Sequence, residues 1–374
     1  MKTGALWWRV DGQESDWKNG QAALDWAEAY LHRADGMYFA DEEVDGLHTP
    51  SRGTETCSVV ETMFSMRAVY EVTANITFMD RLETLAFNSL PAALWPDVTS
   101  NVYHHANNQI ETGAGGPYAY DLYFCCSANV HQGWPKFLFS AVHLQPSEPD
   151  TVVVSGYSPS SSTLPDGSTL DIGGTYPFAD TATVSLSAGE DAATTAPPKA
   201  YNIRLRIPCW SENASVTVET WGWSSSAQVA PPCAFFNASM STGSKLTVTF
   251  VNKIRLYEWS KSTLAGQSLI QGGGIEVHRG ALTYALRPAS TTLRGNPSGG
   301  VQPYPQSLPR GGRADGGWSN ITKSQVSLLS CCCRCCRRFH IAAAACQLTV
   351  STIHLPLLPG HDSAQYHMEL WNLR

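Results

Sequence analysis

The stretch TETCSVVETMFSMRAVYEVT, Thr54 to Thr73, joins a short polar start to a helical pattern. Its apolar residues recur at intervals of three or four, which predicts an amphipathic helix: Val59, Met63, Met66 and Tyr70. Just before this pattern, Glu55 and Cys57 stand two residues apart. In an extended segment both side chains would project to the same side, whereas on a helix they would diverge. The stretch therefore predicts a helix that follows an extended segment with two potential metal ligands.

The start of this helix has the form of a capping box. In Ser58-Val59-Val60-Glu61 the Ser58 hydroxyl can accept a hydrogen bond from a backbone N–H three residues on, while Glu61 reaches back to the N–H of Ser58. Glu55 and Cys57 would then lie ahead of a helix N-terminus, where the helix dipole favours a carboxylate and lowers the pKa of a thiol.

Two more segments of the first 140 or so residues predict helices. Residues 16–32 space Ala22, Trp26 and Tyr30 four apart, with Leu24 and Leu31 beside that stripe. Residues 78–94 place four apolar residues on one face before Pro91 interferes: Leu82, Leu85, Ala86 and Leu90. The first 145 residues are therefore expected to form helical hairpins.

Alternating strand patterns replace the helical ones after residue 145. In residues 200–208, Ile203, Leu205 and Ile207 alternate with three polar residues, and residues 245–251 and 281–286 continue in this way. The sequence predicts an α + β multidomain chain with an antiparallel β-sandwich over residues 146–300. Residues 301–374 are expected to form an irregular tail.

A second group of potential metal ligands lies in FCCSAN, Phe124 to Asn129. A disulfide between the adjacent Cys125 and Cys126 would be strained, but both can bind one ion if the backbone turns between them. Together with Glu55 and Cys57 they supply three thiolates and one carboxylate, a ligand set that suits zinc. The alternative is a surface carboxylate and buried thiols without a metal. Four protein ligands would by default make the zinc site structural.

Composition limits the partners. The net charge of -7 and pI of about 5.9 exclude the basic footprint of a nucleic-acid binder and favour a neutral substrate. No apolar run is long enough for a membrane span, and the N-terminus lacks a signal sequence, which favours the cytosol. Four sequons would instead suit a secreted glycoprotein: Asn75-Ile-Thr, Asn213-Ala-Ser, Asn237-Ala-Ser and Asn320-Ile-Thr.

The eleven cysteines are unevenly placed and predict no even disulfide framework. Cys209 and Cys233 stand isolated, and a burst runs from Cys331 to Cys346. That burst lacks the separated pairs of a zinc finger, so it is either an unusual metal-binding tract or sequence foreign to this domain.

Several long motifs, in order, resemble glycoside hydrolase family 127, the β-L-arabinofuranosidase-like group. They occupy residues 36–73, 80–94 and 125–137, and shorter ones continue through YPFADTATVSL, LRIPCW and RGALTYALRP to Pro288. The resemblance implies an (α/α)6 barrel followed by β-sandwich domains. Relatives carry further helices ahead of the region of Trp7, so residues 1–145 are expected to form only the C-terminal part of that barrel.

The resemblance also implies roles for individual residues. It makes Glu55, Cys57, Cys125 and Cys126 the zinc ligands and Cys125 the nucleophile of a retaining mechanism, which replaces the usual second carboxylate. Glu42, in the stretch ADEE, would be the general acid/base with a raised pKa. The alternative is that Glu42 and its acidic neighbours form a solvated loop.

The expected partner is an oligosaccharide or glycan ending in an L-arabinofuranose-like residue. Aromatic faces and side-chain amides suit a sugar ring and its hydroxyls, and the candidate contacts are His104, His105, Gln109, His131 and Trp134. Two other classes stay open: a noncatalytic carbohydrate-binding or structural zinc protein, and a disulfide-stabilised secreted scaffold with no zinc.

Overall fold

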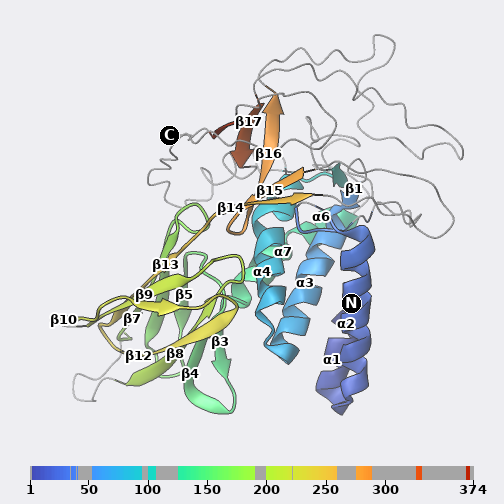
Figure 1. Ribbon diagram of the computed structural model, residues 1–374. Helices are drawn as coiled ribbons and strands as arrows, with labels where there is room; N and C mark the ends of the chain where they lie inside the picture. The colour runs from blue at the N-terminus through green and yellow to red at the C-terminus, as the bar shows by residue number, and fades with distance from the viewer. Residues whose placement is uncertain are drawn as a thin grey trace, which may run out of the picture.

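Helices occupy the first part of the chain and sheets follow (Figure 1). This computed structural model describes residues 2–33, 35–38, 40, 53–94, 100–106, 125–189, 199–220, 222–258, 275–288, 326–330 and 368–370. The helical elements in it are α1 (Lys2–Asp11), α2 (Glu14–Leu31), α3 (Thr56–Thr73), α4 (Ile76–Thr84), a π-helical turn (Leu85–Ser89), α5 (Leu90–Ala92), α6 (Cys125–Val130) and α7 (Gly133–Phe139).

The apolar stripe of α3 is buried as its spacing predicts. Val59, Met63, Met66 and Tyr70 are all buried. The next predicted helix is also present, but it contains a π-turn between α4 and α5, directly ahead of Pro91. Proline has no N–H, and its ring crowds the carbonyl four residues back, so a wider turn lets the helix continue. Pro91 therefore changes the helix without ending it.

The buried face of α2 differs from the predicted stripe. Leu24 and Ala27 are buried, while Ala22 and Trp26 are exposed. Both faces repeat at helical spacing, and packing against α1 decides between them. A side chain at Gly4 would collide with the Asp16 carbonyl, so the two helix backbones approach closely on this side.

Two sheets follow the helices. The larger is antiparallel throughout, with the strand order β10-β9-β13-β7-β6-β5 and β11 also paired with β9. Its strands are β5 (Ser160–Thr163), β6 (Thr169–Gly174), β7 (Thr181–Ser187), β9 (Ala214–Thr220), β10 (Trp223–Ser224), β11 (Gln228–Ala230) and β13 (Lys245–Phe250).

The second sheet has the order β12-β8-β4-β3. Its strands are β3 (Val142–Gln145), β4 (Glu148–Val154), β8 (Ala200–Ile207) and β12 (Ala234–Ser241). β4 and β8 run parallel, because the chain passes through β5, β6 and β7 of the other sheet between them, so pairing is not wholly antiparallel. The predicted alternation holds in β8, where Ile203, Leu205 and Ile207 are fully buried. Residues of both sheets and of the helices belong to one buried core.

A disulfide joins Cys209 to Cys233, with an S–S distance of 2.14 Å. From the sequence alone, these two cysteines are interpreted as isolated residues without a disulfide partner. That interpretation is wrong. Strand pairing explains their meeting: Ile207 of β8 lies opposite Ala234 of β12, so both cysteines stand beside the same end of one antiparallel ladder. The 24 residues between them hide this proximity in the sequence.

The third sheet takes in part of the expected irregular tail. It has the order β14-β15-β16-β17-β18 and comprises β14 (Ile254–Glu258), β15 (Ile275–Arg279), β16 (Leu282–Pro288), β17 (Val326–Ser330) and β18 (Met368–Leu370). The last two strands lie within residues 301–374, while the cysteine burst from Cys331 to Cys346 lies outside the described residues. A two-stranded ladder of β1 (Gly53–Glu55) and β2 (His104–Ala106) stands apart from these sheets.

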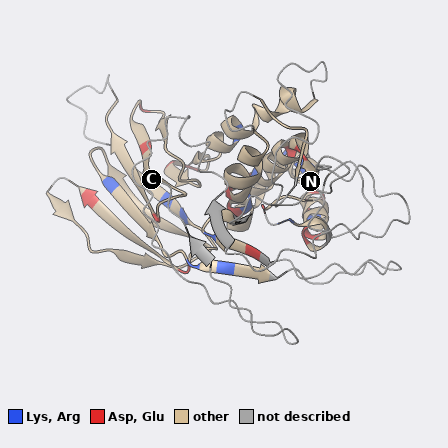
Figure 2. Cartoon of the chain, turned by 90° about the horizontal axis from the view of Figure 1, so that it is seen from above, with Lys and Arg blue, Asp and Glu red and all other residues tan. Residues whose placement is uncertain are grey.

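Charged residues of both signs are scattered over helices and strands (Figure 2). Within the described part of the chain, none of the helices has the length and apolar character needed to cross a bilayer.

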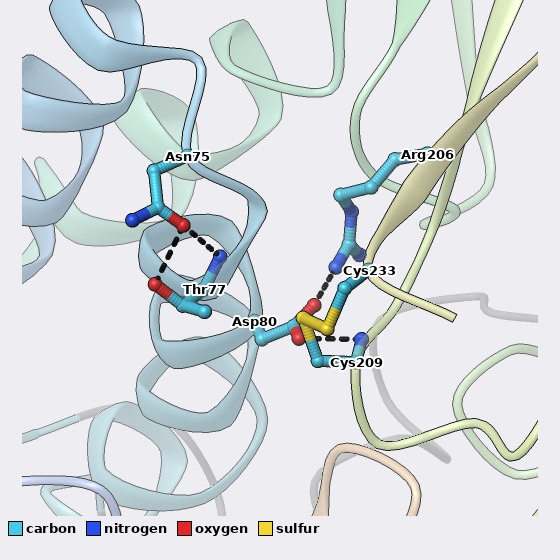
Figure 3. Close-up of a disulfide and its surroundings, with 6 residues drawn as sticks. All are labelled: Asn75, Thr77, Asp80, Arg206, Cys209 and Cys233. Carbon is cyan, nitrogen blue, oxygen red and sulfur yellow. Dashed lines mark hydrogen bonds and ion pairs between the residues drawn. A yellow bond between two sulfur atoms is a disulfide. The ribbon is translucent and has the colours of Figure 1, made fainter. Parts of the chain in front are cut away.

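A buried ion cluster links the helices to the second sheet. Arg206 of β8 is fully buried and pairs with Glu83 of α4 at 2.5 Å. It also pairs with Asp80 of the same helix (Figure 3). Asp80 also accepts from the Cys209 N–H at 2.8 Å, and Tyr176 donates to Glu83 at 2.7 Å. Burial raises the pKa of Asp80 to about 6, although Arg206 opposes this shift. Arg206 is one of the three polar residues that alternate with the apolar ones in β8, and it is nevertheless buried because these two carboxylates lie on the helix facing it.

We expect Arg206→Met to lower the free energy of unfolding by about 3–5 kcal/mol, because it leaves buried carboxylates without their counter-charge. Arg204→Met is the matched control. This arginine precedes Arg206 on the same strand, is only partly buried and bonds Gln145, so its loss should cost about 1 kcal/mol or less. Urea denaturation measures both, and equal losses for the two variants would contradict a special role for Arg206.

A second charged cluster joins α2 to β15. His32 Nδ1 lies 3.3 Å from Glu28, His32 Nε2 lies 3.7 Å from Glu276, and His278 Nε2 lies 3.0 Å from Glu276. Burial alone would lower the pKa of His32, but hydrogen bonds with Glu276 and Glu28 raise it to about 9. Burial would likewise raise the pKa of Glu276, but His278 and His32 lower it to about 2.

These shifts predict how stability depends on pH. The His32 contribution is complete below its ordinary pKa of 6.5 and is lost as the pH rises through about 9, whereas the Glu276 contribution is complete above 4.5 and is lost as the pH falls towards 2. His32→Gln should therefore remove about 1–2 kcal/mol of the decline on the alkaline side, allowing for solvent screening. Denaturation at several pH values tests this, with His131→Gln as an exposed control. Identical alkaline slopes in the parent and His32→Gln would refute it.

Candidate metal centre

Two chain segments bring four potential ligands together. Glu55 ends β1 and is also the N-cap residue of α3, Cys57 lies in the first turn of α3, and Cys125 and Cys126 begin α6. Pairing of β1 with β2 places Glu55 opposite His104, and the Thr56 hydroxyl donates to the Val102 carbonyl at 2.6 Å. The ligand-bearing start of α3 is thus fixed by backbone pairing on one side and by a buried side-chain hydrogen bond on the other.

The sulfur atoms are in contact. Cys57 Sγ lies 3.2 Å from Cys125 Sγ and 3.4 Å from Cys126 Sγ, and both of the latter lie 3.4 Å from Glu55 Oε1. All four ligand atoms lie within 4.8 Å of one another. Tetrahedral ligands at about 2.3 Å from a zinc ion are separated by roughly 3.7 Å, so small shifts would let these four surround one ion.

The predicted capping box does not form. α3 begins at Thr56, three residues earlier than the box requires, and its N-cap residue is Glu55, whose side chain makes no capping hydrogen bond. Glu61 instead pairs with Lys2 of α1. Consequently Glu55 and Cys57 do not share an extended segment. Glu55 has extended backbone and Cys57 is already helical, and the turn between them directs both towards α6.

Two of the three thiols, those of Cys57 and Cys126, favour their neutral form when no cation is present. Burial, followed by hydrogen bonds with Cys125 and Cys126, raises the pKa of Cys57 well above its usual range. Burial chiefly raises the pKa of Cys126 to about 12, and the charge of Glu55 adds to the rise. A bound cation reverses this preference, because a coordinating thiol loses its proton. The chemistry of the four side chains therefore fits a soft divalent ion such as zinc.

The four ligands differ in exposure. Cys126 is buried, Glu55 and Cys57 are half-buried, and Cys125 is exposed. Cys125 is thus the sulfur that a molecule outside the protein can reach most directly.

Sequence reasoning missed Asn129, which lies on α6 one turn beyond Cys125. Its side chain hydrogen-bonds Cys57 and opposes the rise in the pKa of that thiol, as a donor to a thiolate does. Its spacing of four from Cys125 and three from Cys126 on a helix is the signal that could have revealed it.

The two neighbouring histidines of β2 face different surroundings. Side chains alternate along a strand, and directly paired residues of antiparallel strands share a face. His104 is paired with Glu55 and so lies on the Glu55 face of the ladder, half-buried, with its ring centroid 4.4 Å from that of Tyr103. His105 is buried, and its Nε2 lies 3.7 Å from Asp35.

A buried polar cluster surrounds His105. Asp35 accepts from Ser89 at 2.5 Å and pairs with Arg33 at 3.2 Å, while Arg33 also donates to the His105 carbonyl at 3.4 Å. Burial is the main reason why the pKa of His105 is lowered, and Arg33, with His105 and Ser89, holds the pKa of Asp35 well below its usual range. Sequence reasoning missed Arg33, Asp35 and Ser89. Arg33 supports the backbone of β2 through the His105 carbonyl, and Asp35, which accepts from Ser89, pairs with Arg33.

The remaining predicted contacts are dispersed. His131 is exposed in the turn after α6. Trp134 of α7 is half-buried, and its ring lies 5.9 Å from that of Phe87 and 5.4 Å from that of Phe137, within an aromatic cluster of the core. Glu42 and Gln109 lie outside the described residues.

Comparisons with known proteins relate the segment that carries these side chains to a family of glycoside hydrolases. Residues 38–138 match the family model described as Beta-L-arabinofuranosidase, GH127 catalytic domain. No curated protein matches the chain significantly. Among solved structures, one titled "Glycoside hydrolase" is similar at 19% identity and a TM-score of 0.52 over 68% of this chain and 45% of that chain.

Two further similar structures are a GH127 beta-arabinofuranosidase and a GH127 beta-L-arabinofuranosidase from Geobacillus stearothermophilus T6. Both are 16% identical over 76% of this chain, with TM-scores of 0.55 and 0.54 over 46% and 45% of their own lengths. This chain thus spans less than half of each of these three chains, and such identities establish likeness of fold alone. The resemblance to glycoside hydrolase family 127 is confirmed over residues 38–138, the segment that contains all four converging side chains.

Proposed function

We propose that this protein is a zinc-dependent, retaining glycoside hydrolase that removes terminal L-arabinofuranose-like residues from glycans. One observation carries the proposal: three thiols and a carboxylate converge, with one thiol exposed, inside the segment that matches the GH127 catalytic domain. Glu55, Cys57, Cys125 and Cys126 would hold the zinc ion. When bound, zinc supplies a positive charge that keeps thiols deprotonated and stabilises a departing thiolate.

The chain's own residues would perform a double displacement. The Cys125 sulfur attacks the anomeric carbon and expels the leaving-group oxygen, to which Glu42 gives a proton. Water then attacks the same carbon, returns its proton to Glu42 and releases Cys125. Asn129 holds Cys57 in place during both steps by hydrogen bonding to its sulfur.

The sugar is proposed to bind between β2 and the end of α6. His104 lies on the Glu55 face of the ladder and His131 is exposed after α6, so both suit hydroxyl recognition. Gln109 is proposed to contribute an amide. Trp134 and His105 are more buried, so we assign Trp134 to the wall beneath the site and His105 to holding β2.

At the level of the fold, we propose that residues 1–145 belong to an incomplete (α/α)6 barrel, residues 146–300 to a β-sandwich and residues 301–374 to an irregular tail, of which the described strands β17 and β18 extend the third sheet. Contact between the two sheets and the helices in one core supports treating the first two as a single folded body.

A noncatalytic zinc protein is the second candidate function. Four protein ligands leave a tetrahedral ion no open position, as in structural zinc sites. Covalent trapping separates the two candidates, because only the hydrolase forms a sugar adduct on Cys125. Intact-protein mass spectrometry after incubation with a slow arabinofuranoside substrate would detect that adduct.

Zinc affinity should rise with pH. Cys57 and Cys126 have raised pKa values, so binding must displace their protons. We expect the apparent association constant to increase by up to about tenfold per pH unit for each proton displaced. Competition with a chromogenic chelator measures it. Cys57→Ala should bind zinc weakly, whereas the double variant Cys209→Ala/Cys233→Ala should bind like the parent. Retention of full affinity in Cys57→Ala would remove this cysteine from the ligand set.

Cys125→Ala should abolish hydrolysis of an aryl β-L-arabinofuranoside, with kcat reduced by about 10³-fold or more, because the nucleophile is lost. Phe139→Ala, which changes an exposed side chain on α7, is the matched control and should keep the parental rate. An active parent with an equally active Cys125→Ala variant would exclude Cys125 as nucleophile. A zinc-loaded parent that hydrolyses none of these substrates would favour the noncatalytic candidate.

A further inference from the structure

We propose that this protein carries N-linked glycans on Asn75, Asn213 and Asn237. Each of these residues begins a sequon, and each asparagine is exposed in the folded chain. The fourth sequon, at Asn320, lies outside the described residues. Exposure of the asparagine in each of the three described sequons matters because a glycan must project into solvent after folding.

The first site lies in the turn between α3 and α4. Asn75 is the N-cap residue of α4, and its Oδ1 accepts from the Thr77 N–H at 3.1 Å and from the Thr77 hydroxyl at 2.8 Å. Its Nδ2 points away from Thr77 (Figure 3). A glycan replaces one hydrogen of Nδ2 and leaves Oδ1 intact, so the helix cap and the modification are compatible.

The second and third sites belong to the strands. Asn213 precedes β9, and its carbonyl accepts from Val251 N–H at 3.1 Å, which fixes the backbone while the side chain stays exposed. Asn237 lies within β12, where Ala238 and Met240 are buried and the alternate residues Asn237 and Ser239 face solvent.

Glycosylation at Asn237 would also protect the sheet. β12 is the terminal strand in the described order β12-β8-β4-β3. Such an edge offers backbone groups to another chain, and proteins commonly block it with bulky or charged features. A glycan on the exposed face of β12 would hinder that pairing.

The Cys209–Cys233 disulfide independently indicates the same cellular environment. Disulfides persist in oxidising compartments, and N-glycans are added to chains that enter the secretory pathway. The disulfide lies next to the helix that carries the first sequon: Asp80 of α4 accepts from the Cys209 N–H at 2.8 Å (Figure 3). The sequons are features of the sequence and the disulfide is a feature of the structure. Both favour maturation in the oxidising secretory pathway.

The reaction needs a lipid-linked oligosaccharide and a transferase. The asparagine Nδ2 attacks the anomeric carbon of the sugar, forming an N–C bond, while the C–O bond to the lipid pyrophosphate breaks and the pyrophosphate leaves with its electron pair. The amide proton passes to a base of the transferase. No electrons are exchanged with an oxidant or reductant.

The test uses the full chain, directed into the secretory pathway of a eukaryotic cell behind a supplied signal sequence. Enzymatic deglycosylation in heavy-oxygen water converts each modified asparagine to a labelled aspartate, which peptide mass spectrometry locates. We expect label at Asn75, Asn213 and Asn237, and one disulfide-linked peptide containing Cys209 and Cys233. Secreted chains with this disulfide intact but without label at the three asparagines would overturn the proposal.

Matched variants separate modification from folding. Thr77→Ala destroys the first sequon but keeps the Asn75 cap to a backbone N–H, whereas Thr77→Ser keeps both. The first should lose one gel-mobility step and the second should lose none. Ser215→Ala and Ser239→Ala should each lose one step, while Asn202→Asp, an exposed residue of β8 outside any sequon, should lose none. Parental mobility in Thr77→Ala, Ser215→Ala and Ser239→Ala would refute the assignment. These readouts are independent of hydrolase activity.

Discussion

The candidate metal centre depends on keeping three thiols and one carboxylate within 4.8 Å of one another. Four ionised groups so close together would repel strongly, and burial adds the cost of removing them from water. The side chains must therefore be held either as neutral thiols or as ligands of a shared cation. The β1–β2 pairing, the Thr56 hydrogen bond and the early start of α3 all serve to hold one half of the group, while the first turn of α6 holds the other.

Local sequence patterns predicted the helices and strands well where an element has a single apolar face that can pack against the core. The stripe from Val59 to Tyr70 and the alternation in β8 are both buried as expected, because period and burial coincide in a helix or strand with one apolar face. The grouping of Glu55, Cys57, Cys125 and Cys126 could also be anticipated from the sequence, because neighbouring cysteines suggest ligands of a shared metal ion. The exact start of α3 could not, because Thr56 is fixed by Val102, a partner 46 residues away.

Predictions failed where the local sequence allows two arrangements equally well and contacts with distant parts of the chain select one of them. α2 has two possible apolar faces, and contact with α1 selects the one containing Leu24 and Ala27. Likewise, His104 and His105 look equivalent in sequence, but strand pairing and Asp35 give them opposite surroundings. The Cys209–Cys233 bridge depends on the register of β8 against β12, which alternation alone does not specify.

The buried Arg206 has a consequence for how such chains can evolve. Its guanidinium comes from a strand and its two counter-charges from a helix more than 120 positions earlier. A recombination event that replaced the strands while retaining the helices would leave Asp80 and Glu83 in a dry interior with no cation. Shuffling at the junction near residue 145 is therefore penalised, and the two halves are expected to be inherited together.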